Sequence, residues 1–151
     1  MASNIDEVIA VLNNLIETCK DRQYGYQTAA EAVSDSQLKM LFQAYEKQSA
    51  QYAAELQNEV RRLGGDPEKE GSLAGWFLRG WMNVKAAVSG GDEGAVIAEC
   101  ERGEDAAKSN YENALKEFLP ADVQALIQRQ FAGIREGHDR MRALEVTTSR
   151  P

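Results

Sequence analysis

The sequence predicts an all-α protein built as a bundle of four long helices. Ala, Glu, Gln, Leu and Lys are abundant between the helix-breaking residues of the chain, and these residues favour helices. Apolar residues recur at intervals of three and four along four long segments, which is the spacing of one helix face. No stretch alternates apolar and polar residues as a half-buried strand would. Long amphipathic helices without strands bury their apolar faces against one another, which favours a bundle.

Proline and paired glycine mark the ends of the helices. Gly64-Gly65, followed by Pro67, closes the second long helix, Gly90-Gly91 precedes the third, and Pro120 falls at the start of the fourth. Together with a shorter amphipathic segment, the expected helices cover residues 4–33, 35–63, 72–89, 92–118 and 120–145.

The connection between the second and third long helices is unusually long. It spans residues 64–91 and contains the short helix expected at 72–89, whereas antiparallel neighbours in a bundle are joined by a few residues. A partly helical crossover of this length can run the whole bundle and make the two helices that it joins parallel. The other connections are short, so their helices should pair antiparallel. We expect one domain over residues 1–151.

Composition excludes several classes of function. The chain has 17 Lys and Arg against 24 Asp and Glu, a net charge of -7, so it is a poor candidate for binding nucleic acid. No apolar run is long enough to cross a bilayer, and the amino terminus lacks the layout of a secretory signal. Cys19 and Cys100 lie far apart and indicate no disulfide framework. We expect a cytoplasmic protein.

Polar residues interrupt the apolar face of each long helix near its middle. An unpaired buried carboxylate is costly, so Glu104 needs a cation, a hydrogen-bond donor or a proton. An ion pair with Arg22 or Arg135 would satisfy two buried charges at once. The polar network expected in the core consists of Arg22, Gln23, Ser49, Tyr52, Glu104 and His138.

Several stretches of the chain resemble a known family. They read "VLNNLIETCKDRQYGYQTAAE", "RRLGGDPEKEGS", "ECERGEDA" and "LPADVQALIQRQFAGIREGHDRMRAL". Together they are similar to a bacterial family of small ferritin-like four-helix bundles catalogued as a domain of unknown function. The similarity covers about residues 4 to 145. It implies a ferritin-like fold, and it implies no activity.

Comparison with bacterial ferritins tests the metal site that this fold can carry. Their fourth helix reads E-E-G-H, and here His138 matches while Arg135 replaces the glutamate three residues earlier. Ser49 and Tyr52 stand at the Glu-x-x-His of the second helix, and Cys19 stands at the glutamate of the first. With four of the six ligands replaced, we expect no di-iron centre.

Three functions remain open at this stage. The leading one is a non-enzymatic bundle that acts by self-association or through a protein partner, with a role in stress or stationary phase as one option. The second is a metal-binding or redox protein with a non-standard site, for which Cys and His ligands would suit copper or zinc. The ligands expected for it are His138, Glu104, Cys19 and Glu101. The third and least favoured is attachment to a membrane surface through the aromatic residues of 72–89.

Two structural expectations follow from these functions. His138 should point into the bundle, because it lies on the apolar stripe between Ile134 and Met141. Its expected neighbours are Glu104, Arg22 and Tyr52. The apolar segment 72–89 should meet a second copy in a dimer, through Trp76, Phe77 or Trp81.

Overall fold

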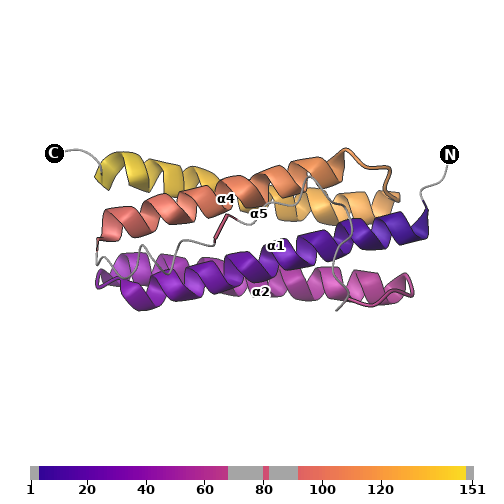
Figure 1. Cartoon of the computed structure of the whole chain (residues 1–151), viewed down its shortest axis with the longest axis horizontal. Coiled ribbons are helices and arrows are strands. Elements are labelled where there is room, and N and C mark those ends of the chain that lie inside the picture. Colours follow the sequence, from indigo (N-terminus) through magenta and orange to yellow (C-terminus); the bar gives the residue numbers. More distant parts are fainter. Residues whose placement is uncertain (1–3, 68–79, 82–91, 149–151) are drawn as a thin grey trace.

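The computed structural model describes residues 4–67, 80–81 and 92–148. They form four long helices: α1 (Ile5–Ala32), α2 (Ser36–Arg62), α4 (Glu93–Leu115) and α5 (Ala121–Thr148). No strand occurs in these ranges, so the prediction of an all-α four-helix bundle is confirmed (Figure 1). None of the described helices is long and apolar enough to cross a membrane.

Side-chain caps fix where three of the helices begin. Asn4, Asp35 and Asp92 precede α1, α2 and α4, and each accepts a hydrogen bond from a backbone N–H of the first turn. These caps satisfy donors that would otherwise have no partner in the helix. At the other end of α2, Gly64 adopts a positive φ of 86°, which favours glycine and turns the chain out of the helix.

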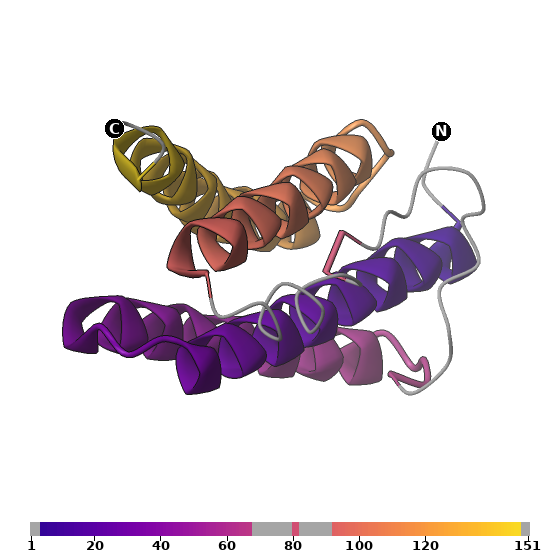
Figure 2. The same ribbon diagram turned by 60° about the vertical axis from the view of Figure 1, so that its left-hand side comes forward.

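The four helices form two antiparallel pairs. Short connections join α1 to α2 and α4 to α5, and α1 lies against α4 (Figures 1 and 2). In Figure 1, α2 and α4 both run from left to right, whereas α1 and α5 run the opposite way. The helices joined by the long crossover are therefore parallel, as its length predicted.

The core consists of two apolar clusters that lie in opposite halves of the bundle. One gathers around Leu12, Leu56 and Ile127, and the other around Tyr26, Phe42 and Met141. In the chain, the polar residues Arg22, Ser49 and Glu104 fall between members of the two clusters, and all three are buried. A buried polar layer therefore separates the two apolar halves of the core.

The helix expected at 72–89 falls outside the described residues except at 80–81, which form a turn. Trp81 packs against Tyr26, with 4.9 Å between the ring centroids, and is 8% exposed. A Cβ atom added to Gly25 of α1 or to Gly103 of α4 would overlap its indole. Two glycines on facing helices thus leave room for this ring inside its own chain.

Two helix ends differ from those expected. α4 ends at Leu115, whereas the expected helix covered residues 92–118. Phe118, an apolar residue at the end of that expected range, therefore lies in the connection to α5 and is 84% exposed. α5 begins one residue after Pro120 and continues to Thr148. The apolar spacing continued past the real end of α4 because a periodicity does not show where the backbone leaves the helix.

We predict that Gly103→Ala lowers the free energy of unfolding, although alanine has a helix propensity better than that of glycine by about 1 kcal/mol. The added methyl group would overlap the Trp81 indole, and such overpacking costs about 1–3 kcal/mol. Urea unfolding followed by circular dichroism measures the change. In a Trp81→Ala background the same substitution should be neutral or stabilising, and an equal loss in both backgrounds would contradict this packing.

Candidate functional site

An ion pair with no exposure to solvent lies between the two core clusters. Arg22 of α1 donates from Nε to Oε1 of Glu104 at 2.7 Å and from a terminal nitrogen to Oε2 at 2.8 Å. Both side chains are 0% exposed. Two parallel hydrogen bonds between a guanidinium and a carboxylate make the strongest and most directional form of this contact. The expected pairing of Arg22 with Glu104 is confirmed.

Helix α2 supplies the remaining acceptors for the guanidinium. The second terminal nitrogen of Arg22 donates to Gln48 Oε1 at 2.8 Å and to the hydroxyl of Ser49 at 3.0 Å. The Ser49 hydroxyl in turn donates to the backbone oxygen of Tyr45. Arg22 therefore uses four of its five N–H groups. The cation is almost fully satisfied without water.

Aromatic rings enclose the other side of the pair. The hydroxyl of Tyr26 donates to Glu104 Oε2 at 2.6 Å. The guanidinium carbon of Arg22 lies 5.3 Å from the ring centroids of both Tyr26 and Tyr45, within the range of a cation–π contact. These rings exclude water and so strengthen the attraction between the charges.

Burial and the neighbouring carboxylate shift the pKa values of Arg22 and Tyr26. Burial alone would lower the pKa of Arg22, but the adjacent carboxylate of Glu104 more than offsets this, so the pKa lies above its usual value. Burial and the same carboxylate raise the pKa of Tyr26 well above its usual range. The guanidinium stays charged and the phenol stays neutral over the whole physiological range.

A second chain of hydrogen bonds links all four helices next to the ion pair. The Tyr111 hydroxyl donates to Gln130 Oε1 at 2.7 Å, so its oxygen accepts from the Cys19 thiol, 3.1 Å away. The Gln130 amide donates to the Tyr52 backbone oxygen and to Glu55 of α2. Gln130 was not among the residues that the sequence indicated for the core.

Cys19 is poorly suited to bind a metal in this setting. Burial raises the pKa of its thiol to about 11, although the Tyr111 hydroxyl partly opposes the shift. Metals bind the thiolate rather than the thiol. Of the four ligands expected from the sequence, Cys19 and Glu104 are thus engaged in two different hydrogen-bond networks.

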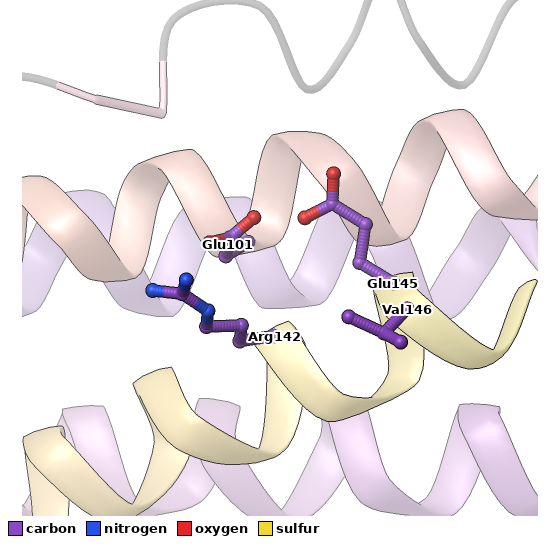
Figure 3. A pocket seen from close by; sticks show the side chains of 4 residues that line it. All are labelled: Glu101, Arg142, Glu145 and Val146. Carbon is purple, nitrogen blue, oxygen red and sulfur yellow. The ribbon is translucent and has the colours of Figure 1, made fainter. Parts of the chain in front are cut away.

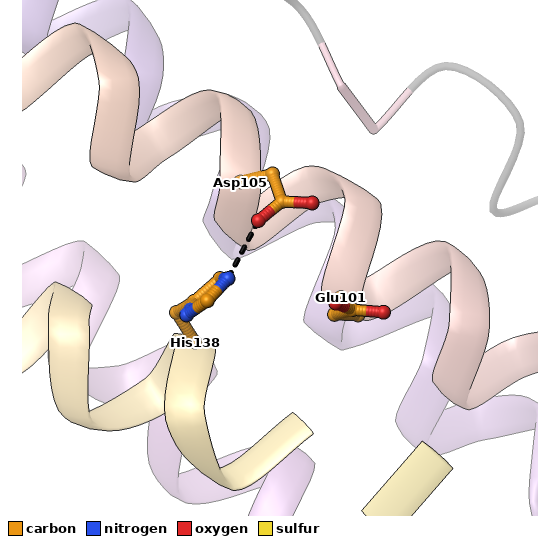
Figure 4. Close-up of side chains that lie close together, drawn as sticks. All are labelled: Glu101, Asp105 and His138. Carbon is orange, nitrogen blue, oxygen red and sulfur yellow. Dashed lines mark hydrogen bonds and ion pairs between the residues drawn. The ribbon is translucent and has the colours of Figure 1, made fainter. Parts of the chain in front are cut away.

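His138 lies elsewhere, at the seam between α4 and α5. It is buried, as expected, with 5% exposure. Its expected neighbours were wrong: Nε2 lies 2.5 Å from Asp105 of α4, and Nδ1 lies 3.1 Å from Asp139 (Figure 4). Gly137, one residue earlier on the helix, is the position that faces the ion pair, because an added Cβ there would overlap Glu104. One residue turns a helix by about 100°, which directs His138 away from Glu104 and towards Asp105.

Other residues of the expected core network take separate places. Gln23 is half-buried. The Tyr52 hydroxyl lies against Gly133 of α5, where an added Cβ would overlap it. Arg135, the other cation considered for Glu104, lies with its guanidinium carbon 5.5 Å from the Phe131 ring centroid. Of the expected interface residues, Trp76 and Phe77 lie outside the described residues.

The residues at the centre of the bundle do not fit a di-iron centre. Such a centre takes glutamates from two helices and a Glu-x-x-His pair from each of the other two. Here Glu104 is the one fully buried carboxylate of the described residues, and its oxygens already accept from Arg22 and Tyr26. The guanidinium of Arg22, in contact with this buried carboxylate, would also repel a metal cation.

We predict that breaking the buried pair on one side costs more stability than replacing both partners. Arg22→Met and Glu104→Leu should each lower the free energy of unfolding by about 3–5 kcal/mol, because each leaves a buried group without its counter-charge or acceptor. The double variant Arg22→Met/Glu104→Leu should recover much of this loss. Urea unfolding of all four proteins measures the coupling, and additive losses would contradict it.

We predict that neither thiol of the folded chain reacts with an aromatic disulfide reagent at pH 8. Cys19 and Cys100 are both buried, and burial raises the pKa of each thiol. Neutral, covered thiols are poor nucleophiles. Absorbance of the released thiolate should show no rapid reaction in the native protein and two equivalents in urea. Rapid release of one equivalent from the native protein would contradict the position of that cysteine.

Comparison with known proteins places the chain in a family. A family model described as "Domain of unknown function (DUF2383)" matches residues 7–117, and no curated protein matches the chain. Among solved structures, a two-domain protein from Anabaena variabilis ATCC 29413 has DJ-1/ThiJ/PfpI-like and ferritin-like domains. The structure of this chain is similar to the Anabaena protein, with a TM-score of 0.81 at 19% sequence identity.

The alignment with the Anabaena protein covers 99% of this chain and 42% of that one. The chain thus spans less than half the length of its structural neighbour, and at this identity the likeness concerns the fold alone. The family resemblance expected from the sequence motifs is confirmed by the family model. This chain belongs to the DUF2383 family, a domain of unknown function, and it has a ferritin-like fold.

Proposed function

We propose that this chain is a non-enzymatic bundle in which an internal ion pair stands in the place of a di-iron centre, and that it acts through its surface. The observation that carries the proposal is the two-fold hydrogen bond between Arg22 and Glu104. A charged side chain supplied by the protein itself holds the helices together where other bundles of this fold hold metal ions. The fold is thereby independent of iron.

The composition of the layer supports a structural role rather than a catalytic one. The Arg22 guanidinium and the Tyr26 phenol are locked in one protonation state by burial and by Glu104. Proton transfer at neutral pH needs a group whose pKa lies near the working pH. Both groups are also sealed from substrate, since Arg22 and Tyr26 are 0% exposed.

The proposed partner is a second copy of the chain or another protein. A ferritin-like domain occurs together with a DJ-1/ThiJ/PfpI-like domain in the Anabaena protein, which supports a role for such bundles beside another folded unit. Two free, buried cysteines are compatible with the reducing cytoplasm. For self-association, the sequence offers the apolar side chains of Trp76 and Phe77 in the crossover.

We predict that the purified, tag-free chain does not bind two Fe²⁺ ions tightly and does not oxidise Fe²⁺ faster than buffer. The guanidinium of Arg22 is paired with the carboxylate of Glu104, the group that would bridge the two ions. An anaerobic calorimetric titration followed by aerobic oxidation gives both readings, with a bacterial ferritin as positive control. Tight binding of two iron ions per chain, with accelerated oxidation, would contradict the proposal.

We predict a dimer in solution, with a mass by light scattering of twice the 16.7 kDa of one chain. The double variant Trp76→Ala/Phe77→Ala should shift the protein to a monomer, because it removes apolar area from the proposed contact. Tyr24→Ala serves as the matched control, since Tyr24 is an exposed aromatic residue of α1. A monomeric wild-type chain at micromolar concentration would exclude self-association and leave a different protein as the partner.

A further inference from the structure

Three potential metal ligands meet at the seam between α4 and α5. Glu101 and Asp105 lie one helical turn apart on α4, and His138 projects towards them from α5 (Figure 4). One ligand atom from each side chain can be chosen so that all three lie within 4.8 Å of one another. This cluster is distinct from the Arg22–Glu104 layer, because Gly137 and not His138 faces that pair.

The hydrogen bonds of His138 make the cluster more than a group of surface acids. Nδ1 lies 3.1 Å from Asp139 and Nε2 lies 2.5 Å from Asp105. Ionised carboxylates only accept hydrogen bonds, so a neutral imidazole can satisfy one of these two contacts with its single N–H. The other nitrogen then presents a lone pair to a carboxylate. That contact needs a cation between its partners, either a second proton or a metal ion.

We propose that Glu101, Asp105 and His138 bind a single divalent transition metal ion, with Zn²⁺ as the best match. Imidazole and carboxylate together suit zinc and its first-row neighbours, whereas Mg²⁺ and Ca²⁺ take oxygen ligands. In this arrangement Nε2 of His138 binds the ion and Nδ1–H donates to Asp139. A carboxylate that accepts from the remote nitrogen is the usual way in which a metal-binding histidine is oriented.

The side chains of the cluster have to rearrange to hold the ion. Zn²⁺ binds nitrogen and oxygen at about 2.0–2.2 Å in tetrahedral geometry, so the ligand atoms of one ion lie about 3.4 Å apart. The Asp105 oxygen, now 2.5 Å from Nε2 of His138, has to move away from it, and separations of up to 4.8 Å have to close by about 1 Å. Rotation of the Asp105 side chain, which is 59% exposed, and of the longer Glu101 side chain can supply this movement.

Solvent reaches the cluster from one side. Beside Glu101 the surface forms an open pocket that is lined also by Arg142, Glu145 and Val146 of α5 (Figure 3). The three protein ligands would leave at least one position of the ion to water or to a small ligand from this pocket. His138 closes the opposite side, since its ring is almost fully buried. A metal ion could enter and leave without opening the bundle.

The experiment uses the tag-free chain, in which His138 is the only histidine. Titration with Co²⁺ should give a saturable visible absorption band at one ion per chain, which Zn²⁺ displaces. Nitrogen-15 spectra of the single imidazole should show a metal-bound Nε2 and a protonated Nδ1 with Zn²⁺. An imidazole protonated on both nitrogens in the presence of excess Zn²⁺ would overturn the proposal.

Variants assign the binding to these residues. His138→Gln and Asp105→Asn should each weaken Co²⁺ binding by more than the loss of about 10–100-fold that an outer-shell partner alone can cause. Glu112→Gln is the matched control, because it removes one negative charge from an exposed position of the same helix. It should bind Co²⁺ like the wild type. Undiminished binding by His138→Gln, or an equal loss in the Glu112→Gln control, would overturn the site.

Metal binding at the seam between α4 and α5 can be distinguished from metal binding in the core, which the proposed function excludes. One ion per chain that depends on His138 supports the seam site and leaves the core ion pair in place. In the His138→Gln variant, tight uptake of two iron ions would instead show a metal centre in the core.

Discussion

The structure depends on one interaction, the buried contact between the guanidinium of Arg22 and the carboxylate of Glu104. It joins α1 to α4, the two helices that make most of the contacts between the antiparallel pairs. Gln48 and Ser49 add α2 to the same layer. Burying either charge alone would cost several kcal/mol. The layer therefore strongly disfavours any register of the helices that separates the two side chains.

Glycines on the helices make room for this layer, because long polar side chains and large rings need space between closely packed helices. Gly137 admits the ion pair and Gly133 admits the Tyr52 hydroxyl, both on α5. Gly25 and Gly103 admit Trp81 between α1 and α4. Each is a helix-interior glycine that lowers helix propensity, and each is placed where a Cβ atom would collide with a neighbour. Each glycine therefore lowers the stability of its helix in isolation but allows a close contact with a neighbouring helix.

Periodicity, breakers and the long crossover were sufficient to predict the all-α bundle and its parallel α2 and α4. The charged residues on apolar stripes were also sufficient to predict that Glu104 pairs with a cation, since two opposite buried charges need each other. They left Arg22 and Arg135 as alternatives, and Arg22 is the partner. The residues that contact His138 could not be predicted from the apolar periodicity or from the buried charges. A helix stripe is wide enough to include Gly137 and His138, but a rotation of about 100° separates the groups that they face. Asp105 was missed because its polar character and exposure gave no sign of a partner on α5.

We propose that Arg22 occupies the place where metal ions would otherwise join the four helices. A crystal structure of the protein grown with excess Fe²⁺, with anomalous data collected at the iron edge, is the decisive measurement. We expect Arg22 within hydrogen-bond distance of both Glu104 oxygens and no anomalous peak in the layer between the two apolar clusters. Two iron peaks bridged by Glu104, with the Arg22 side chain displaced from it, would rule this arrangement out.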